Sequence, residues 1–338
     1  MKAYLIRERG VERNRIEDVE IPEISQGEVL VKVKMAGVHP MDYSMAEELS
    51  THGQQLNPFP HIPGEEISGT IYKLYPGENT FKIGQRVIIY HRIYDGTCDL
   101  CQKSMENLCR NGGRYGVNAN GGFAEYMKVP VRNVIAFPRN MGWETATCFP
   151  VSFITPYHAF KKAGVSQGET VAIFGATGNT GIFAVQIAKS MGAKVFAISR
   201  EESEWLTGYG ADFVIKYNEA KEKISKLTGG KMCDYVLDPL GASTFDLSLS
   251  LTGANGKWIS YGEATGSDLK LNVISLYRYE KSLLGSRGGT KKELEYAVNN
   301  FQDIKVRIWK KYRFDDISEA INMAGSGHKD GKIFVEFS

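Results

Sequence analysis

The stretch "AIFGATGNTGIFAVQIAK", residues 172–189, places three glycines between two apolar runs. The run before them, "ETVAIF" (169–174), predicts a buried strand, and "NTGIFAVQIAKSMG" (179–192) has the period of a helix. Glycine permits a tight turn and the close approach of a pyrophosphate, and the helix N-terminus adds free N–H groups. The stretch therefore predicts a dinucleotide site. The residues expected to bind the cofactor there are Gly175, Thr177, Gly178, Asn179, Thr180 and Gly181.

Strands and helices alternate on the C-terminal side of this loop. Strand-like runs recur at "AKVFAIS", "ADFVIKY", "CDYVLDPLG", "GKWISYG" and "KSLLGSR", and "EESEWLTGYG" (201–210) predicts a helix that ends in glycine. Because strands that alternate with helices form right-handed crossovers, residues 151–289 are expected to fold as a doubly wound parallel sheet.

The first 150 residues have a different pattern. Short runs such as "EVLVKVKMAGV" and "ISGTIYKLY" are rich in β-branched and aromatic residues and predict strands, with little helical periodicity. A helix "KKELEYAVNNF" and a strand "GKIFVEF" end the chain, and this strand does not continue the parallel pattern. We expect residues 290–338 to return to the β-rich domain of residues 1–150, which gives an α/β protein of two domains.

The composition excludes several classes of function. The chain has 338 residues with 41 basic and 39 acidic side chains, so its charge gives no reason to expect a nucleic acid or an anionic membrane as partner. It contains no apolar run of membrane-spanning length and no signal-peptide core. Its five cysteines do not form a secreted disulfide framework, so a reducing, cytoplasmic location is expected.

The end of the second predicted strand indicates which cofactor binds. An acid there binds the ribose 2′-hydroxyl of NAD, but the chain has Ser199 and Arg200, which suit the 2′-phosphate of NADP(H). Lys216 and Tyr217, at the end of the third strand, are expected to flank the same phosphate. Glu201 and Glu202 argue for NAD(H) if either points inward.

The segment "CDLCQKSMENLC" (98–109) holds three of the five cysteines. Clustered thiols in a reducing compartment indicate a metal, and a tetrahedral structural zinc needs four ligands. Cys98, Cys101 and Cys109 supply three of them. Nearby carboxylates and His91 can supply a fourth, and three free thiols without metal remain the alternative.

Taken together, these features resemble the medium-chain dehydrogenase/reductase superfamily. The resemblance covers essentially the whole chain and includes "GQRV" (84–87), "GGFAEYM" (121–127), "LDPLG" (237–241) and "SYG" (260–262). It implies a GroES-like catalytic domain, a Rossmann cofactor domain and an active site in the cleft between them. It also implies hydride transfer between a nicotinamide and an alcohol, carbonyl, enone or quinone, and a homodimer or homotetramer.

The resemblance also implies the fourth ligand of the cysteine lobe, expected near residues 91–112. The family pattern Cys-x2-Cys-x2-Cys-x7-Cys places its first ligand on Asp95, and a carboxylate can bind zinc. The expected set is Asp95, Cys98, Cys101 and Cys109, a closed structural site. His91, Asp99 and Glu106 are alternatives whose spacing does not match the pattern.

The segments that resemble the family's catalytic zinc site depart from its ligand pattern. His39 stands where a cysteine is usual, Glu65 replaces a histidine, and Val151 replaces the last ligand, whereas Glu66 is kept. "GVHPMD" and "PVSFITPY" are instead similar to segments of zinc-free quinone oxidoreductases. Two interpretations follow: no catalytic metal binds, or His39, Glu65 and Glu66 form an unusual divalent site.

Without a catalytic metal, the expected reaction is NADPH-dependent reduction of a quinone, enone or other activated carbonyl compound. The expected catalytic residues are His39 and Tyr43 as hydrogen-bond or proton donors, Asp42 as a brace, Glu66, and Thr155 near the nicotinamide. Gly262 marks close approach to the cofactor, and Lys332 is expected to reach a phosphate. The alternatives are a zinc-dependent alcohol dehydrogenase and a nucleotide-binding protein without turnover.

Overall fold

The structure is a computed structural model that describes residues 1–47, 58–326 and 331–338. The chain divides into two compact units: Met1–Ser152 with Thr290–Ser338, and Phe153–Gly289. In the described part of the chain, no helix has both the length and the apolar character needed to cross a membrane.

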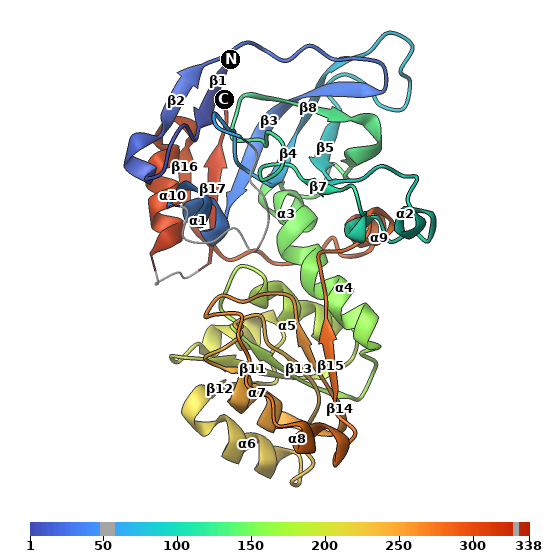
Figure 1. The fold of residues 1–338 in the computed structure, drawn as a ribbon, viewed down its shortest axis with the longest axis vertical. Coiled ribbons are helices and arrows are strands. Elements are labelled where there is room, and N and C mark those ends of the chain that lie inside the picture. Colours follow the sequence, from blue (N-terminus) through green and yellow to red (C-terminus); the bar gives the residue numbers. More distant parts are fainter. Residues whose placement is uncertain (48–57, 327–330) are drawn as a thin grey trace. The chain divides into compact units, whose positions relative to one another are not determined.

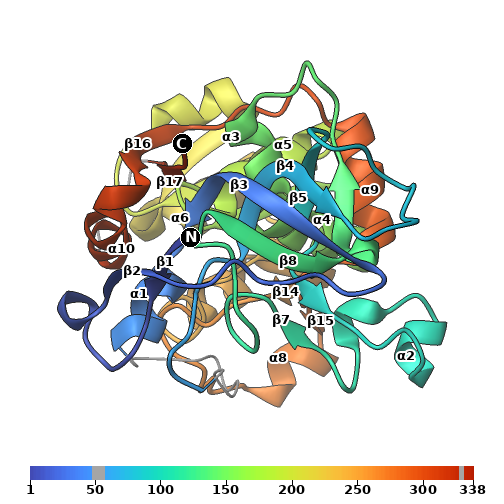
Figure 2. The ribbon, with the colours of Figure 1, turned by 90° about the horizontal axis from the view of Figure 1, so that it is seen from above.

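The first unit is built on a seven-stranded sheet that is mostly antiparallel. Its strands run in the order β16-β17-β3-β4-β5-β9, and β8 also pairs with β3, beside which it lies in Figure 2. The last strand, β17 (Lys332–Glu336, red in Figure 1), pairs with β3 (Glu28–Val38), so the expected return of the chain end to the β-rich unit is confirmed. Apolar side chains of β3, β4, β17 and α10 form its core.

Besides β3 and β17, the first unit contains further strands and helices. The strands are β1 (Lys2–Leu5), β2 (Arg15–Asp18), β4 (Glu66–Leu74), β5 (Arg86–Ile89), β6 (Arg92–Ile93), β7 (Gly113–Arg114), β8 (Tyr126–Pro130), β9 (Val134–Ala136) and β16 (Ile308–Arg313). The helices are α1 (Pro40–Glu47), α2 (Asp99–Gln102), α3 (Trp143–Cys148), α9 (Lys291–Asn300) and α10 (Ile317–Gly325), and a π-helical turn spans Phe149–Phe153.

Helix α1 was not expected, since "PMDYSMAE" lacks a clear apolar period. Its start has recognisable local causes: Pro40 occupies the first position, and the Asp42 carboxylate accepts a hydrogen bond from the His39 N–H at 2.7 Å. The helix buries only Asp42, Met45 and Ala46. So small a buried face leaves almost no periodic signal in the sequence.

The second unit contains a six-stranded sheet, all parallel, in the order β12-β11-β10-β13-β14-β15. This order confirms the expected doubly wound Rossmann fold (Figure 1). Its strands are β10 (Thr170–Phe174), β11 (Lys194–Ser199), β12 (Phe213–Lys216), β13 (Cys233–Leu237), β14 (Thr252–Ser260) and β15 (Ser282–Gly285). Its helices are α4 (Ile154–Ala163), α5 (Gly181–Ser190), α6 (Ala220–Leu227), α7 (Phe245–Leu251) and α8 (Val273–Tyr277).

One predicted helix of this unit takes a shorter form. The sequence predicts a helix over residues 201–210, but only Glu204–Tyr209 are helical. They form a 3-10 helix that ends at Gly210, whose φ is 105°. Gly208 within this segment lowers its helical propensity, and Leu206 is its one buried side chain.

Candidate functional site

Three neighbouring strands of the first unit bring charged residues to one end of the sheet. Gly37 of β3 pairs with Glu66 at the start of β4, and Val38 pairs with Ile333, the residue after Lys332. His39 follows directly after β3. A Cβ atom on Gly37 would lie 2.2 Å from Glu66 Oε2, so only glycine leaves room for this carboxylate against β3.

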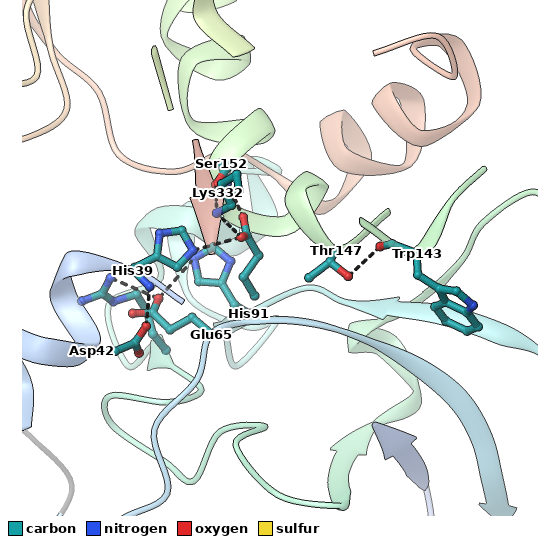
Figure 3. Close-up of polar contacts among 10 residues, drawn as sticks. His39, Asp42, Glu65, His91, Trp143, Thr147, Ser152 and Lys332 are labelled. Carbon is teal, nitrogen blue, oxygen red and sulfur yellow. Dashed lines mark hydrogen bonds and ion pairs between the residues drawn. The ribbon is translucent and has the colours of Figure 1, made fainter. Parts of the chain in front are cut away.

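Glu66 is fully buried and its carboxylate is saturated with partners. Oε2 accepts a hydrogen bond from Lys332 Nζ at 2.6 Å and lies 3.0 Å from His39 Nε2, while Oε1 accepts the Ser152 N–H at 2.8 Å (Figure 3). Burial alone would raise the pKa of Glu66. The charge of Lys332, followed by that of His39, outweighs burial and holds the pKa of this carboxyl well below its usual range.

Lys332 is completely buried, and this differs from the phosphate contact expected from the sequence. Its Nζ donates to Glu66 and, at 2.8 Å, to Ser152 Oγ. Because a buried ammonium needs such partners, Lys332 belongs to the His39 and Glu66 site, and we do not retain it as a phosphate ligand.

The two residues expected beside His39 have different environments. Asp42 is buried and braces the His39 backbone, and burial raises the pKa of its carboxyl to about 7. Tyr43 packs its ring against Gly325 of α10, where a Cβ would lie 2.4 Å from the ring, and against the apolar core. Packing therefore holds the Tyr43 ring in place, and the expected role of its hydroxyl as a donor stays a prediction.

Glu65 is ion-paired with a buried arginine. Arg114 Nη1 lies 3.2 Å from Glu65 Oε2, and His91 Nε2 lies 4.0 Å from the same oxygen. Both Glu65 and Arg114 are buried. Burial, followed by the positive charges of Arg92 and Arg114, lowers the pKa of His91 well below its usual value. Glu65 is thus neutralised by a protein cation.

The cysteine lobe brings its four predicted ligands together. Ligand atoms of Asp95, Cys98, Cys101 and Cys109 all lie within 4.8 Å of one another. The Asp95 carboxylate accepts N–H groups of Thr97 and Cys98 at 2.8 and 3.0 Å. Backbone N–H groups of Cys98 and then Thr97 hold the pKa of this carboxyl well below its usual range. Three thiols and one carboxylate fit a closed tetrahedral zinc site.

The alternative fourth ligands have other partners. Asp99 forms a bidentate ion pair with Arg110, and the Glu106 carboxylate accepts a hydrogen bond from the backbone N–H of Lys291. His91 lies next to Glu65. The geometry therefore favours Asp95.

The glycine loop has the close backbone packing that a dinucleotide site requires. Gly175 has a φ of +63°, and a Cβ on Gly181 would lie 2.1 Å from the Gly175 carbonyl oxygen. The N–H of Gly178 donates to that same oxygen at 2.9 Å. Thr180 precedes α5 and accepts a hydrogen bond from the Tyr261 hydroxyl at 3.0 Å. The tight glycine turn before the start of α5 fits a nicotinamide dinucleotide.

The ends of β11 and β12 form a small polar hollow of about 150 Å³. Ser199 is buried there and its hydroxyl donates to the Glu201 carbonyl at 2.7 Å, while Arg200 is exposed. Lys216 forms an ion pair with Glu202 at 2.8 Å. Tyr217 is half-buried and packs against Phe174, the residue before the glycine loop.

Two further predicted residues lie in the second unit. Thr155 is half-buried in α4. Gly262 is exposed directly after β14 and Tyr261, and a Cβ there would lie 2.6 Å from the Pro239 carbonyl oxygen. Their expected positions beside the nicotinamide remain predictions.

Sequence comparisons cover nearly the whole chain. Residues 25–139 match the family model described as "Alcohol dehydrogenase GroES-like domain", and residues 180–303 match "Zinc-binding dehydrogenase". An NAD-dependent alcohol dehydrogenase of Sulfolobus acidocaldarius is 31% identical, with 98% of each chain covered. The chain belongs to the zinc-type medium-chain dehydrogenase/reductase superfamily.

Other members of this superfamily are similar to the same extent. An acryloyl-coenzyme A reductase of Sulfurisphaera tokodaii is 30% identical, with 95% of this chain and 96% of the relative covered. A thermostable alcohol dehydrogenase from Pyrobaculum aerophilum superposes with a TM-score of 0.90 and 33% identity, covering 99% of both chains, and a further structure of that enzyme has cobalt and zinc bound. The chain is therefore an oxidoreductase of this superfamily.

His39, Glu65 and Glu66, which the resemblance places at a catalytic metal position, already have protein partners. Within residues 1–47, 58–326 and 331–338, the cysteine lobe is the one group of three or more His, Cys, Asp or Glu residues whose ligand atoms converge. His39, Glu65 and Glu66 do not form such a group, and Glu65 and Glu66 are each neutralised by a buried cation. Cys148 is buried, and burial raises the pKa of its thiol well above the usual value.

Sequence reasoning missed three residues that shape this site. Gly37 makes room for Glu66, Ser152 contacts both Glu66 and Lys332, and Arg114 neutralises Glu65. The unusual "GEE" at 64–66 was the available signal, because two adjacent acids in an apolar segment require cations.

Proposed function

We propose that this oxidoreductase reduces an activated carbon–carbon double bond or a quinone with a nicotinamide cofactor and uses no catalytic metal. The observation that carries the proposal is the pair of buried ion pairs, Glu65 with Arg114 and Glu66 with Lys332, where a metal would otherwise need its ligands. Each carboxylate already has a compensating charge. A divalent ion would therefore have to displace a protein cation in order to bind.

A site without a Lewis acid favours reduction of soft acceptors over oxidation of alcohols. Deprotonating an alcohol of pKa near ~16 at pH 7 costs about 12 kcal/mol, at 1.36 kcal/mol per pKa unit. A bound metal removes most of that cost. Hydride addition to the β-carbon of an enone instead gives an enolate, which hydrogen-bond donors can stabilise.

His39 is the proposed donor for this reaction. The nicotinamide supplies the hydride when it is bound. Glu66 Oε2 lies 3.0 Å from Nε2 of the imidazole, and the Asp42 carboxylate accepts a hydrogen bond from the His39 backbone N–H. In its imidazolium form the ring carries a second proton on Nδ1, which can hydrogen-bond the substrate carbonyl oxygen or protonate the enolate.

The curated relatives support an activated double bond as the substrate class. Two acryloyl-coenzyme A reductases are 30% and 28% identical over 95% and 99% of this chain. The α,β-unsaturated thioester named there accepts hydride at its β-carbon as an enone does. An enoyl thioester is therefore the first substrate to test beside enones and quinones.

NADPH is the proposed cofactor form. Ser199 and Arg200 stand where an acid would bind the ribose of NAD. The neighbouring carboxylate of Glu202 works against this preference. We therefore expect a modest ratio of NADPH to NADH affinity.

The second candidate is a dehydrogenase of alcohols. It is favoured by the names of relatives such as the alcohol dehydrogenase of Geobacillus stearothermophilus, 30% identical over 99% of both chains. A chelator-sensitive reaction would distinguish this candidate from the metal-free reductase.

The test is a substrate panel measured with and without a chelator. NADPH and NADH oxidation with acryloyl-coenzyme A, an enone and a quinone is compared with NADP⁺ and NAD⁺ reduction by primary and secondary alcohols. We expect chelator-insensitive reduction and little alcohol oxidation. His39→Ala should lower kcat by about 100-fold or more, whereas Tyr43→Phe, in the helix α1 that follows His39, should change it little. Rapid alcohol oxidation that a chelator abolishes would contradict the proposal.

A further inference from the structure

Lys332 is a buried cation that the proposed chemistry does not use directly. It is 0% exposed, and its ammonium contacts Glu66 Oε2 and Ser152 Oγ at 2.6 and 2.8 Å. A buried ammonium is costly unless it is paired, and an apolar residue of similar length would avoid that cost. Its presence at the start of β17, in register with the end of β3, calls for a role beyond packing.

The contact next to Lys332 determines where His39 carries its proton. Glu66 Oε2 lies 3.0 Å from His39 Nε2. An ionised carboxylate can only accept, so it selects the imidazole tautomer with the proton on Nε2. A neutral carboxylic acid has an O–H and can donate to Nε2 instead, which selects the opposite tautomer with the proton on Nδ1.

We propose that Lys332 is a positioning residue that keeps Glu66 an acceptor and thereby sets the tautomer and orientation of the His39 ring. This inference rests on the proposed function only in giving His39 a catalytic task. The contacts run from Lys332, at the start of β17, through Glu66, at the start of β4, to His39, which directly follows β3. Figure 3 labels Lys332 and His39 at the two ends of this chain of contacts.

The remaining contacts of Glu66 do not replace the charge of Lys332. The Ser152 N–H donates to Oε1 but is neutral, and the His39 ring, when it is neutral, supplies no charge either. Glu66 itself is 0% exposed, so water cannot stabilise its charge. Without the ammonium, this buried carboxyl is expected to take up a proton.

The test uses histidine labelled with ¹⁵N and two-bond ¹H–¹⁵N spectra, which report which ring nitrogen carries the proton. The chain has six histidines, and His39→Gln identifies the signal of His39. In the wild-type protein at a pH where the ring is neutral, we expect the proton on Nε2. Lys332→Met should move it wholly or largely to Nδ1. Lys332→Arg, which keeps the charge, and Ser152→Ala, which keeps the ammonium, should retain the wild-type pattern.

A second measurement separates this role from a merely structural one. Lys332→Met should lower kcat for the substrate that the panel identifies by at least about tenfold with little change in KM. A protonated Glu66 no longer stabilises the imidazolium that donates from Nδ1, and the neutral Nδ1–H tautomer is a far weaker acid. Lys332→Gln keeps hydrogen-bonding capacity without charge, and should give the same tautomer result if the methionine variant does not fold.

An unchanged Nε2 proton on His39 in either variant would overturn the inference. The NMR outcome does not depend on turnover. If none of the substrates in the panel reacts, the proposed reaction is contradicted, but the positioning role of Lys332 is not. If the tautomer of His39 does not change in the variants, the positioning role is contradicted, but the proposed reaction is not.

Discussion

At the scale of single residues, Asp42 couples the site to pH. Its carboxyl is buried, and burial raises its pKa from 3.8 to about 7. The folded state therefore holds this proton more tightly than the unfolded chain does. The contribution of Asp42 to stability is full below pH 4 or so and is lost as the pH rises through about 7.

Asp42→Asn should remove this dependence. The variant's free energy of unfolding, relative to wild type, should increase as the pH rises from about 4 to about 7, by at most about 1.4 kcal/mol per pH unit. Urea unfolding at pH 5, 6, 7 and 8 measures this difference. Subtracting the wild-type free energy of unfolding from that of the variant at each pH cancels the contributions of other titrating groups. Examples are His61 and His91, whose pKa values are lowered by burial. A difference that is constant across this range would contradict the assignment.

Residue-level prediction from sequence succeeded where partners are close along the chain. The lobe residues Asp95, Cys98, Cys101 and Cys109 span fifteen positions. The cysteine spacing predicts three of them and the family pattern adds Asp95, and the structure brings these four together. Lys332 and Glu66 are 266 positions apart, and only the register of β17 against β3 makes them neighbours. No local pattern reports such a contact, so Lys332 was assigned to a phosphate instead.

At the scale of elements, we propose that the ends of β11 and β12 determine the cofactor preference. Lys216 is expected to contact a 2′-phosphate, but Glu202 already holds its ammonium at 2.8 Å. Glu219 and Lys223 form a second pair at 2.6 Å beside the same hollow. A phosphate has to compete with Glu202 for Lys216.

Glu202→Gln should therefore strengthen NADPH binding and leave NADH binding unchanged. An exposed pair of this kind is weak, so the expected gain in NADPH affinity is about threefold. Fluorescence titration of both cofactors at low and high salt measures it, and the gain should shrink at high salt. Glu219→Gln is the matched control, since it releases Lys223 in the same hollow. Equal changes for both cofactors, or the same gain in the control, would show that Lys216 does not contact the phosphate.

Prediction of elements followed the strength of the periodic signal. The strands of the parallel sheet and α5 have apolar residues at a regular period, and the sequence predicts them correctly. Helix α1 and the 3-10 helix at Glu204–Tyr209 were misjudged, because each buries too few apolar side chains to impose a period. Their form is determined by local turns and by packing.

At the scale of the whole molecule, we propose that the chain keeps one of the two metal positions of a zinc-type dehydrogenase and has lost the other. The cysteine lobe keeps four convergent ligands. The other position holds Glu65 with Arg114 and Glu66 with Lys332, so protein cations balance its charge. The metal of the lobe then supports the fold, and reduction depends on His39 and the cofactor.

The zinc content per chain tests this division most directly. Elemental analysis of protein purified without added metal should give about one zinc per chain, and Cys101→Ser should reduce it to near zero while lowering thermal stability more than turnover. About two zinc ions in the wild-type protein, or about one that remains in Cys101→Ser, would contradict the account, because that zinc would have to bind at His39, Glu65 and Glu66.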